Sequence, residues 1–525
     1  MALAHPETSA LVQPSKDGGA HLVLNFSQFA SHVAGATRQL QDQGISRGCR
    51  TLLMVQPGLE LVVLVFSLFQ VGAVPIVIDP GMGLRNFRAC VKRTKPDALV
   101  GGGLAQAISI LFFQTFRSVS IRACIRKNFL QVCAQRDEPV DLKPAHAKPE
   151  DLAAILFTSG STGPPKGVCY EHRHFDAQVQ ILRDLYNIKP GEVDMPLLPV
   201  FALFNPALGM TTVVPPVNPS KPAKADPARI VRILQEFKVT NSFGSPVLWK
   251  LIGEHCETNE IQLPDLRRIL MAGASVPPEL LRQWIKIAPG AKIHTPYGAT
   301  ECLPVSSISA KRILSETCIK TEAGYGSCLG RAVPGISIRI QPPIGDSETT
   351  IQEDQEIGEI VVTGPVVTTA YDQLPEATER AKIREGDILW HRMGDLGYLD
   401  NERNLWFCGR VAERVVTPEG PLFTDFCEAV FNQHPRVLRS ALIGLGQVGS
   451  QKPAIVVQPE TGHFPRDARK RGAFVEELSE IALSSPRTRT IETFFFHRDF
   501  PVDVRHNAKI HRLALARIFG SQTNV

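Results

Sequence analysis

The segment "FTSGSTGPPKGV", from Phe157 to Val168, combines glycines, hydroxyl side chains and a lysine directly after the apolar run "DLAAILF". Backbone N–H groups in such a turn bind phosphate oxygens, and the lysine adds a positive charge. Gly160, Gly163 and Lys166 follow a G-x-x-G-x-x-K spacing, which differs from the P-loop pattern G-x-x-x-x-G-K-[ST]. The segment therefore predicts a phosphate-binding loop outside the Walker-type ATPases and kinases. A solvated turn between a strand and a helix is the alternative.

Four further segments rich in polar residues and glycine follow this loop. In chain order they are "YGATE" (Tyr297 to Glu301), "GEIVVTG" (Gly358 to Gly364), "GDLGYLD…LWFCGR" (Gly394 to Arg410) and "HNAKIHR" (His506 to Arg512). Each is a weak signal alone. A lone pentapeptide such as "YGATE" and a Gly-Asp pair such as that in "GDLGYLD" are also typical of turns, and most lysines are solvated, which is the ordinary expectation for one in a segment such as "HNAKIHR" as well.

A histidine cluster, "HRHFD", lies just after the loop and contains His172, His174 and Asp176. We interpret it as the start of a helix and its cap rather than a catalytic set.

The elements that must position these residues follow from the hydrophobic pattern. The first 150 residues alternate helical stretches with short strands such as "CRTLLMVQ" and "PDALVGGG", which predicts βαβ units with a parallel sheet. The stretch "LRRILMAGASVPPELLRQWIKI" indicates another strand, turn and helix. From about Ile357, short alternating strands predict an antiparallel, β-rich region. The last hundred or so residues contain enough strands and helices for a small α+β domain.

Length and composition exclude several classes of protein. A chain of 525 residues is too long for one core, so about two to four domains are expected. The net charge of +5 gives little reason to expect a nucleic-acid partner.

The cysteines and the N-terminus bear on the cellular compartment. The eleven cysteines lack zinc-site spacing, which favours reduced thiols in a cytoplasm, and the N-terminus has no secretion signal. The apolar run Leu61 to Ile78 is interrupted by Gln70, Gly72 and Pro75, which favours a buried helix, turn and strand over a transmembrane segment.

Together the five segments resemble the adenylate-forming superfamily of acyl-CoA synthetases, luciferases and peptide-synthetase adenylation domains. The resemblance covers nearly the whole chain. It implies an α/β fold: a large N-terminal domain of layered α/β subdomains plus a β-rich subdomain, then a small mobile α+β C-terminal domain. The implied division is 1–411 for ATP and the acyl substrate and 412–525 for a lid. The implied reaction is attack of a carboxylate on the α-phosphorus of ATP, with Mg²⁺ as the metal.

The resemblance assigns phosphate and metal roles to particular residues. Loop N–H groups and hydroxyls would hold the β- and γ-phosphates, and Lys166 would add a catalytic positive charge. The implied loop residues are Thr158, Ser159, Gly160, Ser161, Thr162 and Gly163. In "YGATE", Tyr297 would stack on adenine and Thr300 would bind the α-phosphate. Glu301 would bind Mg²⁺, a hard cation that prefers carboxylate oxygen.

The resemblance also assigns the ribose contacts and the catalytic lysine. Asp395 would accept hydrogen bonds from both ribose hydroxyls, with Arg410 beside it. Lys509 would stand between the substrate carboxylate and the α-phosphate, where it stabilises charge that grows in the transition state. Further implied nucleotide-binding positions are Gly273, Ala274 and Gly298.

Several details depart from the common acyl-CoA synthetase pattern. Ala202 stands where many relatives have a histidine, and the neutral Asn205 argues against an amino-acid substrate. At the hinge, Ala412 replaces the usual Asp or Lys. The segments "PVFALFNPALG", "EGPLFTDFCEAVFNQHPRV", "FPVDVRHNAKIHR" and "GAVPIVIDPGMG" are similar to OleC-type β-lactone synthetases of long-chain olefin biosynthesis.

That similarity implies adenylation of a long-chain 2-alkyl-3-hydroxyalkanoic acid, followed by attack of its own β-hydroxyl on the activated carbonyl. A fatty acyl-CoA or acyl-AMP ligase is the alternative function, and a non-catalytic binding scaffold is a third possibility.

The acyl pocket is expected around Phe201, Phe204 and Trp249, which equally suit a core. Implied partners are thiolase-like, reductase and hydrolase-like enzymes. The segment Ile110 to Arg122 is either an amphipathic face for a lipid or partner, giving peripheral membrane contact, or a buried helix, which we favour.

Overall fold

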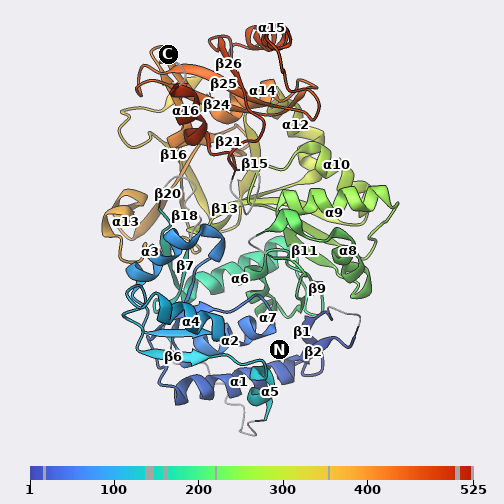
Figure 1. Cartoon of the computed structure of the whole chain (residues 1–525), viewed down its shortest axis with the longest axis vertical. Coiled ribbons are helices and arrows are strands. Elements are labelled where there is room, and N and C mark those ends of the chain that lie inside the picture. The colour runs from blue at the N-terminus through green and yellow to red at the C-terminus, as the bar shows by residue number, and fades with distance from the viewer. Residues whose placement is uncertain are drawn as a thin grey trace.

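The structure is a computed structural model that describes residues 1–15, 19–135, 147–157, 164–218, 221–352, 355–502 and 509–521. The predicted phosphate-loop residues Thr158 to Gly163 lie outside these ranges. Two large sheets and a smaller C-terminal sheet are stacked along the long axis, with helices packed against them (Figure 1).

The first sheet has the strand order β6-β5-β3-β4-β7-β8 within the described residues. Its first five strands are parallel, and β8 is antiparallel to β7. This confirms the predicted βαβ arrangement of the first 150 residues. The bounds are β3 Arg50–Met54, β4 Val74–Val77, β5 Ala98–Gly101, β6 Ile121–Cys124, β7 Leu152–Phe157 and β8 Gly167–Glu171, with helices α1 Phe26–Asp42, α2 Leu59–Val71, α3 Leu84–Thr94, α4 Gly103–Leu111 and α5 Phe129–Ala134.

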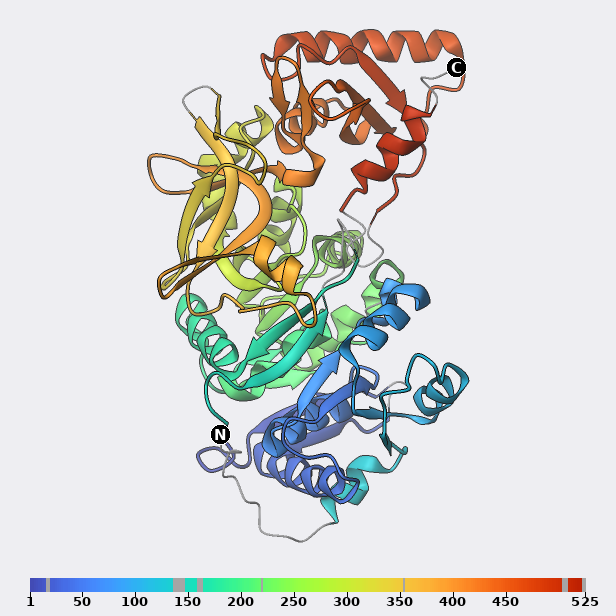
Figure 2. The ribbon, with the colours of Figure 1, turned by 90° about the vertical axis from the view of Figure 1, so that its left-hand side faces the viewer.

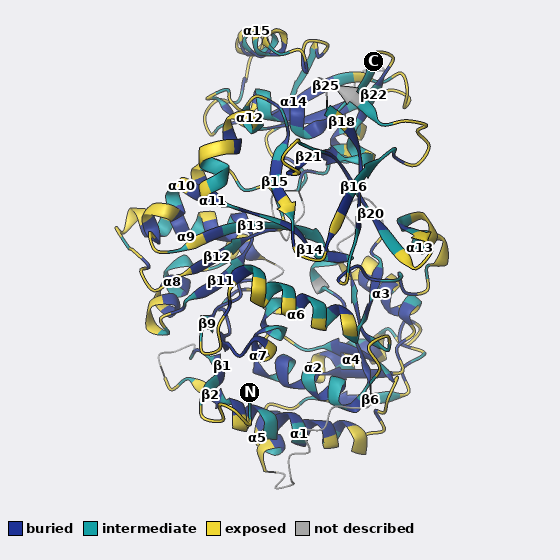
Figure 3. Cartoon of the chain, turned by 180° about the vertical axis from the view of Figure 1, so that it is seen from behind, coloured by how far each residue is buried: buried dark blue, intermediate teal, exposed yellow. Residues whose placement is uncertain are grey.

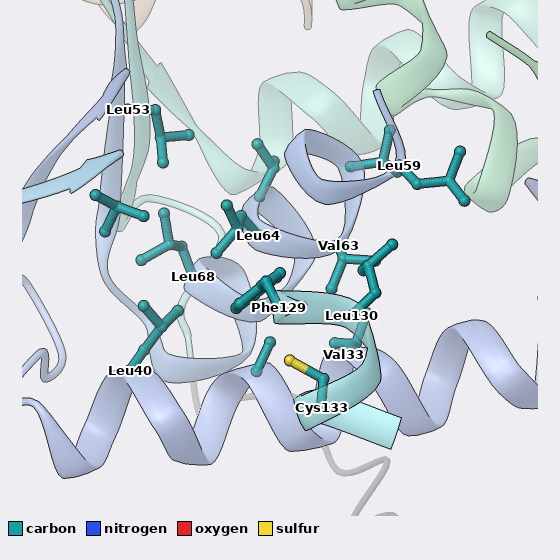
Figure 4. Packing of buried hydrophobic residues seen from close by; sticks show 14 of the residues in the cluster. Val33, Leu40, Leu53, Leu59, Val63, Leu64, Leu68, Phe129, Leu130 and Cys133 are labelled. Carbon is teal, nitrogen blue, oxygen red and sulfur yellow. The ribbon is translucent and has the colours of Figure 1, made fainter. Parts of the chain in front are cut away.

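A hydrophobic core forms where α1, α2 and α5 meet beneath this sheet (Figure 4). Helix α2 is apolar nearly all round, as expected for a helix buried on most of its surface. It ends at Gly72, whose φ of 79° is left-handed and favours glycine, and the chain then enters β4. The buried helix, turn and strand predicted for Leu61 to Ile78 is confirmed. The labelled core side chains are Val33, Leu40, Leu53, Leu59, Val63, Leu64, Leu68, Phe129, Leu130 and Cys133.

The second sheet is continuous from a parallel half to an antiparallel half, in the order β16-β18-β20-β21-β15-β14-β13-β12-β11-β9-β10-β1-β2. Figure 3 shows its strands as a mixture of buried and intermediate residues, with many of the exposed residues on the helices. The parallel half contains β1 Ser9–Gln13, β9 Val193–Asp194, β10 Thr211–Val213, β11 Asn241–Gly244, β12 Arg268–Met271 and β13 Lys292–Ala299, with β2 Leu22–Asn25 antiparallel at its edge. The helices here are α6 His172–Tyr186, α7 Asn205–Leu208, α8 Pro227–Glu236, α9 Pro246–Thr258 and α10 Pro278–Ile287.

The antiparallel half confirms the β-rich region predicted from about Ile357. Its strands are β14 Cys302–Ser309, β15 Ser327–Ala332, β16 Ser337–Gln341, β17 Thr350–Gln352, β18 Gln355–Thr363, β19 Lys382–Glu385, β20 Ile388–Leu399 and β21 Leu405–Arg410. The short helices beside it are α11 Ala310–Arg312, α12 Cys318–Glu322 and α13 Pro375–Ala381.

The C-terminal elements form one end of the molecule, orange to red in Figure 2, opposite the blue N-terminal elements. The strand order β24-β25-β26 defines a small sheet, and β22 pairs with β23. Bounds are β22 Val415–Thr417, β23 Gly420–Leu422, β24 Val437–Leu445, β25 Lys452–Pro459 and β26 Thr493–Phe496, with α14 Thr424–Phe431, α15 Ala468–Ser484 and α16 Arg512–Gly520. The predicted boundary between residues 411 and 412 falls in the 3-10 turn Val411–Glu413 and stays a prediction.

The favoured interpretation of Ile110 to Arg122 as a buried helix is wrong. Helix α4 ends at Leu111, the chain makes turns, and β6 begins at Ile121. Phe113 is 66% exposed, whereas Phe116 is buried. Because Arg122 pairs with Leu99 across β6 and β5, the sheet register ends any helix before this point. Within the described residues, none of the helices has both the length and the apolar character needed to cross a bilayer.

Candidate active site

One continuous cleft of about 3730 Å³ lies between the second sheet, the first sheet and the C-terminal elements. Typical small-molecule sites are roughly 300–1,000 Å³, so this cleft has room for a nucleotide and a long chain together. All ten predicted site residues that the structure describes line it: Lys166, Gly273, Ala274, Tyr297, Gly298, Thr300, Glu301, Asp395, Arg410 and Lys509. The roles assigned to them stay predictions.

Asp395 forms one corner of the cleft, where the register of two strands places it opposite Arg410. The hydroxyl of Tyr297 donates to Asp395 Oδ2 at 2.6 Å, and Arg410 Nε lies 3.0 Å from Asp395 Oδ1. Oδ1 is buried and has no aligned hydrogen bond within the described residues, so the Arg410 contact is an ion pair without good hydrogen-bond geometry. A ribose hydroxyl is the kind of donor that this orphaned oxygen fits.

Burial and the negative charge of Asp395 raise the pKa of Tyr297 well above its ordinary value, so the phenol stays a donor. Two of the predicted nucleotide-binding positions require glycine. A side chain at Gly298 would bring its Cβ within 2.7 Å of the Cys302 carbonyl, and Gly273 adopts a left-handed φ of 98°.

A second corner joins Lys166 and Glu301 through Tyr371. Lys166 Nζ lies 4.6 Å from the centre of the Tyr371 ring, and the Tyr371 hydroxyl donates to Glu301 Oε1 at 2.7 Å. The Tyr371 segment pairs along β8, because Asp372 N donates to the Gly167 carbonyl at 2.7 Å. Tyr371 therefore holds the predicted metal ligand next to the predicted phosphate-binding lysine. Sequence reasoning missed it, since a single tyrosine in "TTAYDQ" has no distinguishing pattern.

A buried lysine lies behind Glu301. Lys382 Nζ donates to the Thr368 carbonyl, while Thr368 donates from its N and Oγ1 to the Glu301 carbonyl at 2.9 and 3.0 Å. Burial lowers the pKa of Lys382 to about 8, and the negative charge of Glu301 opposes that shift. The backbone carbonyl of Glu301 is thus held by two hydrogen bonds from Thr368.

Glu301 fits a magnesium ion that arrives with a phosphate ligand. Within the described ranges no group of three or more His, Cys, Asp or Glu side chains could hold a metal alone. Mg²⁺ is commonly bound by one or two carboxylates plus substrate phosphates and water, so a single carboxylate next to a phosphate site suffices.

The acyl end of the cleft is aromatic. Phe201 packs against Phe243 in a tilted arrangement with ring centres 4.0 Å apart, and its ring centre lies 6.2 Å from that of Phe204. All three side chains line the cleft. Trp249 does not line the cleft; it is fully buried and packs edge-on against Trp284. Of the three predicted pocket aromatics, two line the cleft and one is core.

A carboxyl group that sequence reasoning missed lies near this end. Asp194, on β9, accepts from Asn205 Nδ2 at 2.8 Å, and both line a smaller cavity beside the cleft. Burial raises the pKa of Asp194 to about 7, against the opposing effects of the Asn205 hydrogen bond and the positive charge of Arg268. Asn205, which the sequence indicates as the polar residue near the acyl pocket, therefore already donates a hydrogen bond to Asp194.

The C-terminal segment that carries Lys509 is tied to the predicted hinge. Three residues after Lys509, Arg512 Nη1 lies 2.8 Å from Glu413 Oε2, and its Nε and Nη2 each lie 2.6 Å from Glu428. Despite burial, which would lower it, the two carboxylates raise the pKa of Arg512. At Gly409 a Cβ would lie 2.3 Å from Thr424 Oγ1, so the chain before the hinge packs tightly on α14.

The histidines of the "HRHFD" cluster serve the start of α6, as predicted. The helix begins at His172, and the ring of His174 accepts the Glu171 N–H at 2.9 Å in a capping box. Burial lowers the pKa of His174 to about 4, so it stays neutral. The structure pairs none of the eleven cysteines in a disulfide.

Comparison with known proteins agrees with this geometry. The family described as AMP-binding enzyme matches residues 2–372. The olefin beta-lactone synthetase of Xanthomonas campestris pv. campestris is 40% identical over 96% of this chain and 92% of its own length. That of Stenotrophomonas maltophilia is 39% identical over 98% and 96%. The crystal structure of ATP-bound MatB from Rhodopseudomonas palustris has the same fold, with a TM-score of 0.77 at 19% identity over 98% of this chain and 96% of that one. The chain therefore belongs to the AMP-binding enzyme family, as an ATP-dependent, AMP-forming acid-activating enzyme similar to the β-lactone synthetases.

Proposed function

We propose that this chain is an ATP-dependent β-lactone synthetase acting on a long-chain 2-alkyl-3-hydroxyalkanoic acid. The observation that carries the proposal is the near-full-length similarity to two olefin β-lactone synthetases, which covers 96% and 98% of this chain. The aromatic acyl end at Phe201 and Phe204 supports an apolar substrate. The products are the β-lactone, AMP and pyrophosphate.

In the first half-reaction the substrate carboxylate attacks the α-phosphorus of ATP, and pyrophosphate leaves. Asp395 and Arg410 hold the ribose, and Lys166 attracts the phosphates. Lys509 neutralises charge that develops between the carboxylate and the α-phosphate. Glu301, held by Tyr371, would bind Mg²⁺, which would offset charge on the phosphate oxygens.

In the second half-reaction the β-hydroxyl oxygen of the acyl-adenylate attacks its own carbonyl carbon. The new C–O bond closes the four-membered ring, the acyl–phosphate bond breaks, AMP leaves with the electron pair, and the hydroxyl proton is released to water. Because the nucleophile is tethered, its effective concentration is high and no thiol acceptor is needed, although ring strain offsets part of this advantage. Ala412 at the predicted hinge is compatible with a weakened CoA half-reaction.

The division at residues 411 and 412, with a mobile C-terminal lid, belongs to this proposal. So do a cytoplasmic location and cooperation with thiolase-like, reductase and hydrolase-like enzymes. A fatty acyl-CoA or acyl-AMP ligase of the same fold is the competing function, and it requires an external thiol.

The test uses purified protein, ATP, Mg²⁺ and a long-chain 2-alkyl-3-hydroxy acid, with and without CoA. Products are read by proton NMR without heating, because β-lactones lose CO₂ when hot. A lactone formed without CoA is the expected result, and Lys509→Ala should abolish both the lactone and ATP–pyrophosphate exchange. A thioester that requires CoA would assign the chain to the ligases, and unaltered exchange in Lys509→Ala would refute the role of that lysine.

A further inference from the structure

One buried amide in the cleft has an unused acceptor. Gln178, on α6, is 2% exposed, and its Nε2 donates to the Leu303 carbonyl at 2.9 Å. Its Oε1 has no hydrogen-bond partner within the described part of the chain. Because the Leu303 contact needs the amide nitrogen, the oxygen cannot exchange places with it without losing that bond. A buried amide oxygen without a donor is costly and calls for an explanation.

The position of Gln178 is central to the predicted chemistry. The residue lines both the main cleft and the smaller cavity of about 70 Å³, and Leu303 lies on the same shared wall. Beside it, the Tyr170 hydroxyl donates to the Thr300 carbonyl at 2.5 Å. The Tyr170 hydrogen is therefore not available to Gln178, whose own amide bonds the Leu303 carbonyl, two residues after Glu301.

The surroundings favour a hydroxyl donor attached to an alkyl chain. The smaller cavity is bounded largely by apolar side chains, including those of Leu182, Ile188, Leu208 and Met210. Arg268 also lines this cavity and would repel a free ammonium group, and Asp194 there is engaged by Asn205, whereas a hydroxyl needs only one acceptor. In a 2-alkyl-3-hydroxy acid, the β-hydroxyl is the donor that stands next to the carboxylate.

We propose that Gln178 Oε1 accepts a hydrogen bond from the β-hydroxyl of the substrate and so selects β-hydroxy acids before ATP is consumed. This inference rests on the proposed function. The hydrogen bond occupies the hydroxyl hydrogen and fixes the oxygen, whose lone pairs can then face the carbonyl carbon. A neutral amide suits this place better than a carboxylate, which would repel the substrate's own carboxylate.

The first test compares three acids of equal chain length in ATP–pyrophosphate exchange with the unaltered enzyme. One carries the β-hydroxyl, one carries hydrogen at that carbon, and one carries fluorine, which resembles the hydroxyl in size but cannot donate. We expect kcat/KM for the hydroxy acid to exceed that for both others by about tenfold, the effect of one buried hydrogen bond. Equal values for the three acids would overturn the inference and leave adenylation standing.

The second test uses Gln178→Met, which keeps an unbranched side chain and removes the acceptor. The preference for the hydroxy acid over the deoxy acid should collapse to within about twofold, while exchange with the deoxy acid persists. Thr212→Val is the matched control: Thr212 Oγ1 is also buried without a partner in the described residues, but Thr212 lines neither cavity. A preference retained in Gln178→Met, or lost equally in the control, would refute the role. No exchange with any acid in the unaltered enzyme would refute the proposed function and this inference with it.

Discussion

Asp194 makes a pH-dependent contribution to stability whose sign and size follow from its surroundings. It is 7% exposed, and burial raises its pKa from 3.8 to about 7. As pH rises above about 4, the unfolded chain loses this proton while the native protein retains it. The native state is therefore progressively disfavoured between about pH 4 and pH 7, and above pH 7 the cost is constant.

Each pKa unit corresponds to about 1.4 kcal/mol, so the full effect is about 4 kcal/mol, of which about 3 kcal/mol falls between pH 5 and pH 8. Asp194→Asn keeps the size of the side chain and removes the ionisation. Its amide oxygen can still accept from Asn205. The stability of the variant relative to the unaltered protein should therefore increase with pH.

Thermal unfolding of both proteins from pH 5 to pH 8 measures this difference. The gap in Tm, variant minus unaltered, should widen by several degrees over this interval. Asp184→Asn, the same change at an exposed position on α6, should show a gap near zero at every pH. A gap for Asp194→Asn that does not change with pH would refute the argument that this carboxyl is protonated in the native state.

Three further substitutions address the cleft and the hinge. Tyr371→Phe should lower kcat/KM for adenylation by about tenfold and raise the Mg²⁺ concentration needed, because Glu301 loses a hydrogen bond. Asp395→Ala should raise the KM for ATP by about tenfold or more in pyrophosphate exchange, since hydrogen bonds to a buried carboxylate are lost. Arg512→Met should destabilise the protein by about 3–5 kcal/mol in denaturant unfolding, because two buried carboxylates lose their counter-charge.

Each of these changes has a matched control. Tyr398→Phe removes a buried tyrosine hydroxyl whose partner is the Tyr325 carbonyl, outside the cleft, and should leave the Mg²⁺ requirement unchanged. Asp387→Ala is the control for Asp395→Ala and should leave the KM for ATP nearly unchanged, because Asp387 is exposed. Arg517→Met is the control for Arg512→Met and should leave the stability nearly unchanged, because Arg517 is exposed as well. An unchanged Mg²⁺ dependence in Tyr371→Phe would refute the link from Tyr371 to the metal ligand. A normal KM in Asp395→Ala would refute the ribose role, and full stability in Arg512→Met would refute the hinge contact.

The sequence predicts local structure well where short-range rules act alone. Apolar periodicity and Gly72 predict α2, the turn and β4, because helix burial and a left-handed stop depend on neighbouring residues. Long-range pairing is different. Strand β1 is parallel to β10, about 200 residues later, and no local pattern specifies that partner. The pattern of Ile110 to Arg122 alone predicts a helix. In the fold, however, Ile121 and Arg122 belong to β6 and pair with β5, so a helix cannot continue to this point.

The residues of the candidate site likewise fall into two groups: those that a local sequence pattern identifies and those that matter only through long-range contacts. Residues in recognisable segments, such as Glu301 and Asp395, could be named before the structure was known, and they line one cleft. Tyr371, Asp194 and Gln178 could not, since their importance comes from what folding places beside them. A tyrosine, an aspartate and a glutamine in ordinary strands and helices become notable only through a 2.7 Å contact, deep burial or an unpaired oxygen.

The central claim is that the β-hydroxyl oxygen itself attacks an activated carboxyl carbon, and oxygen labelling tests this most directly. The substrate is prepared with ¹⁸O only in the β-hydroxyl and converted with ATP, Mg²⁺ and the purified enzyme. Mass spectrometry of the lactone and AMP then locates the label. We predict that the label stays in the ring oxygen of the lactone and that AMP is unlabelled. Label in AMP or in phosphate would mean that the hydroxyl is activated instead of the acid, and would contradict the account.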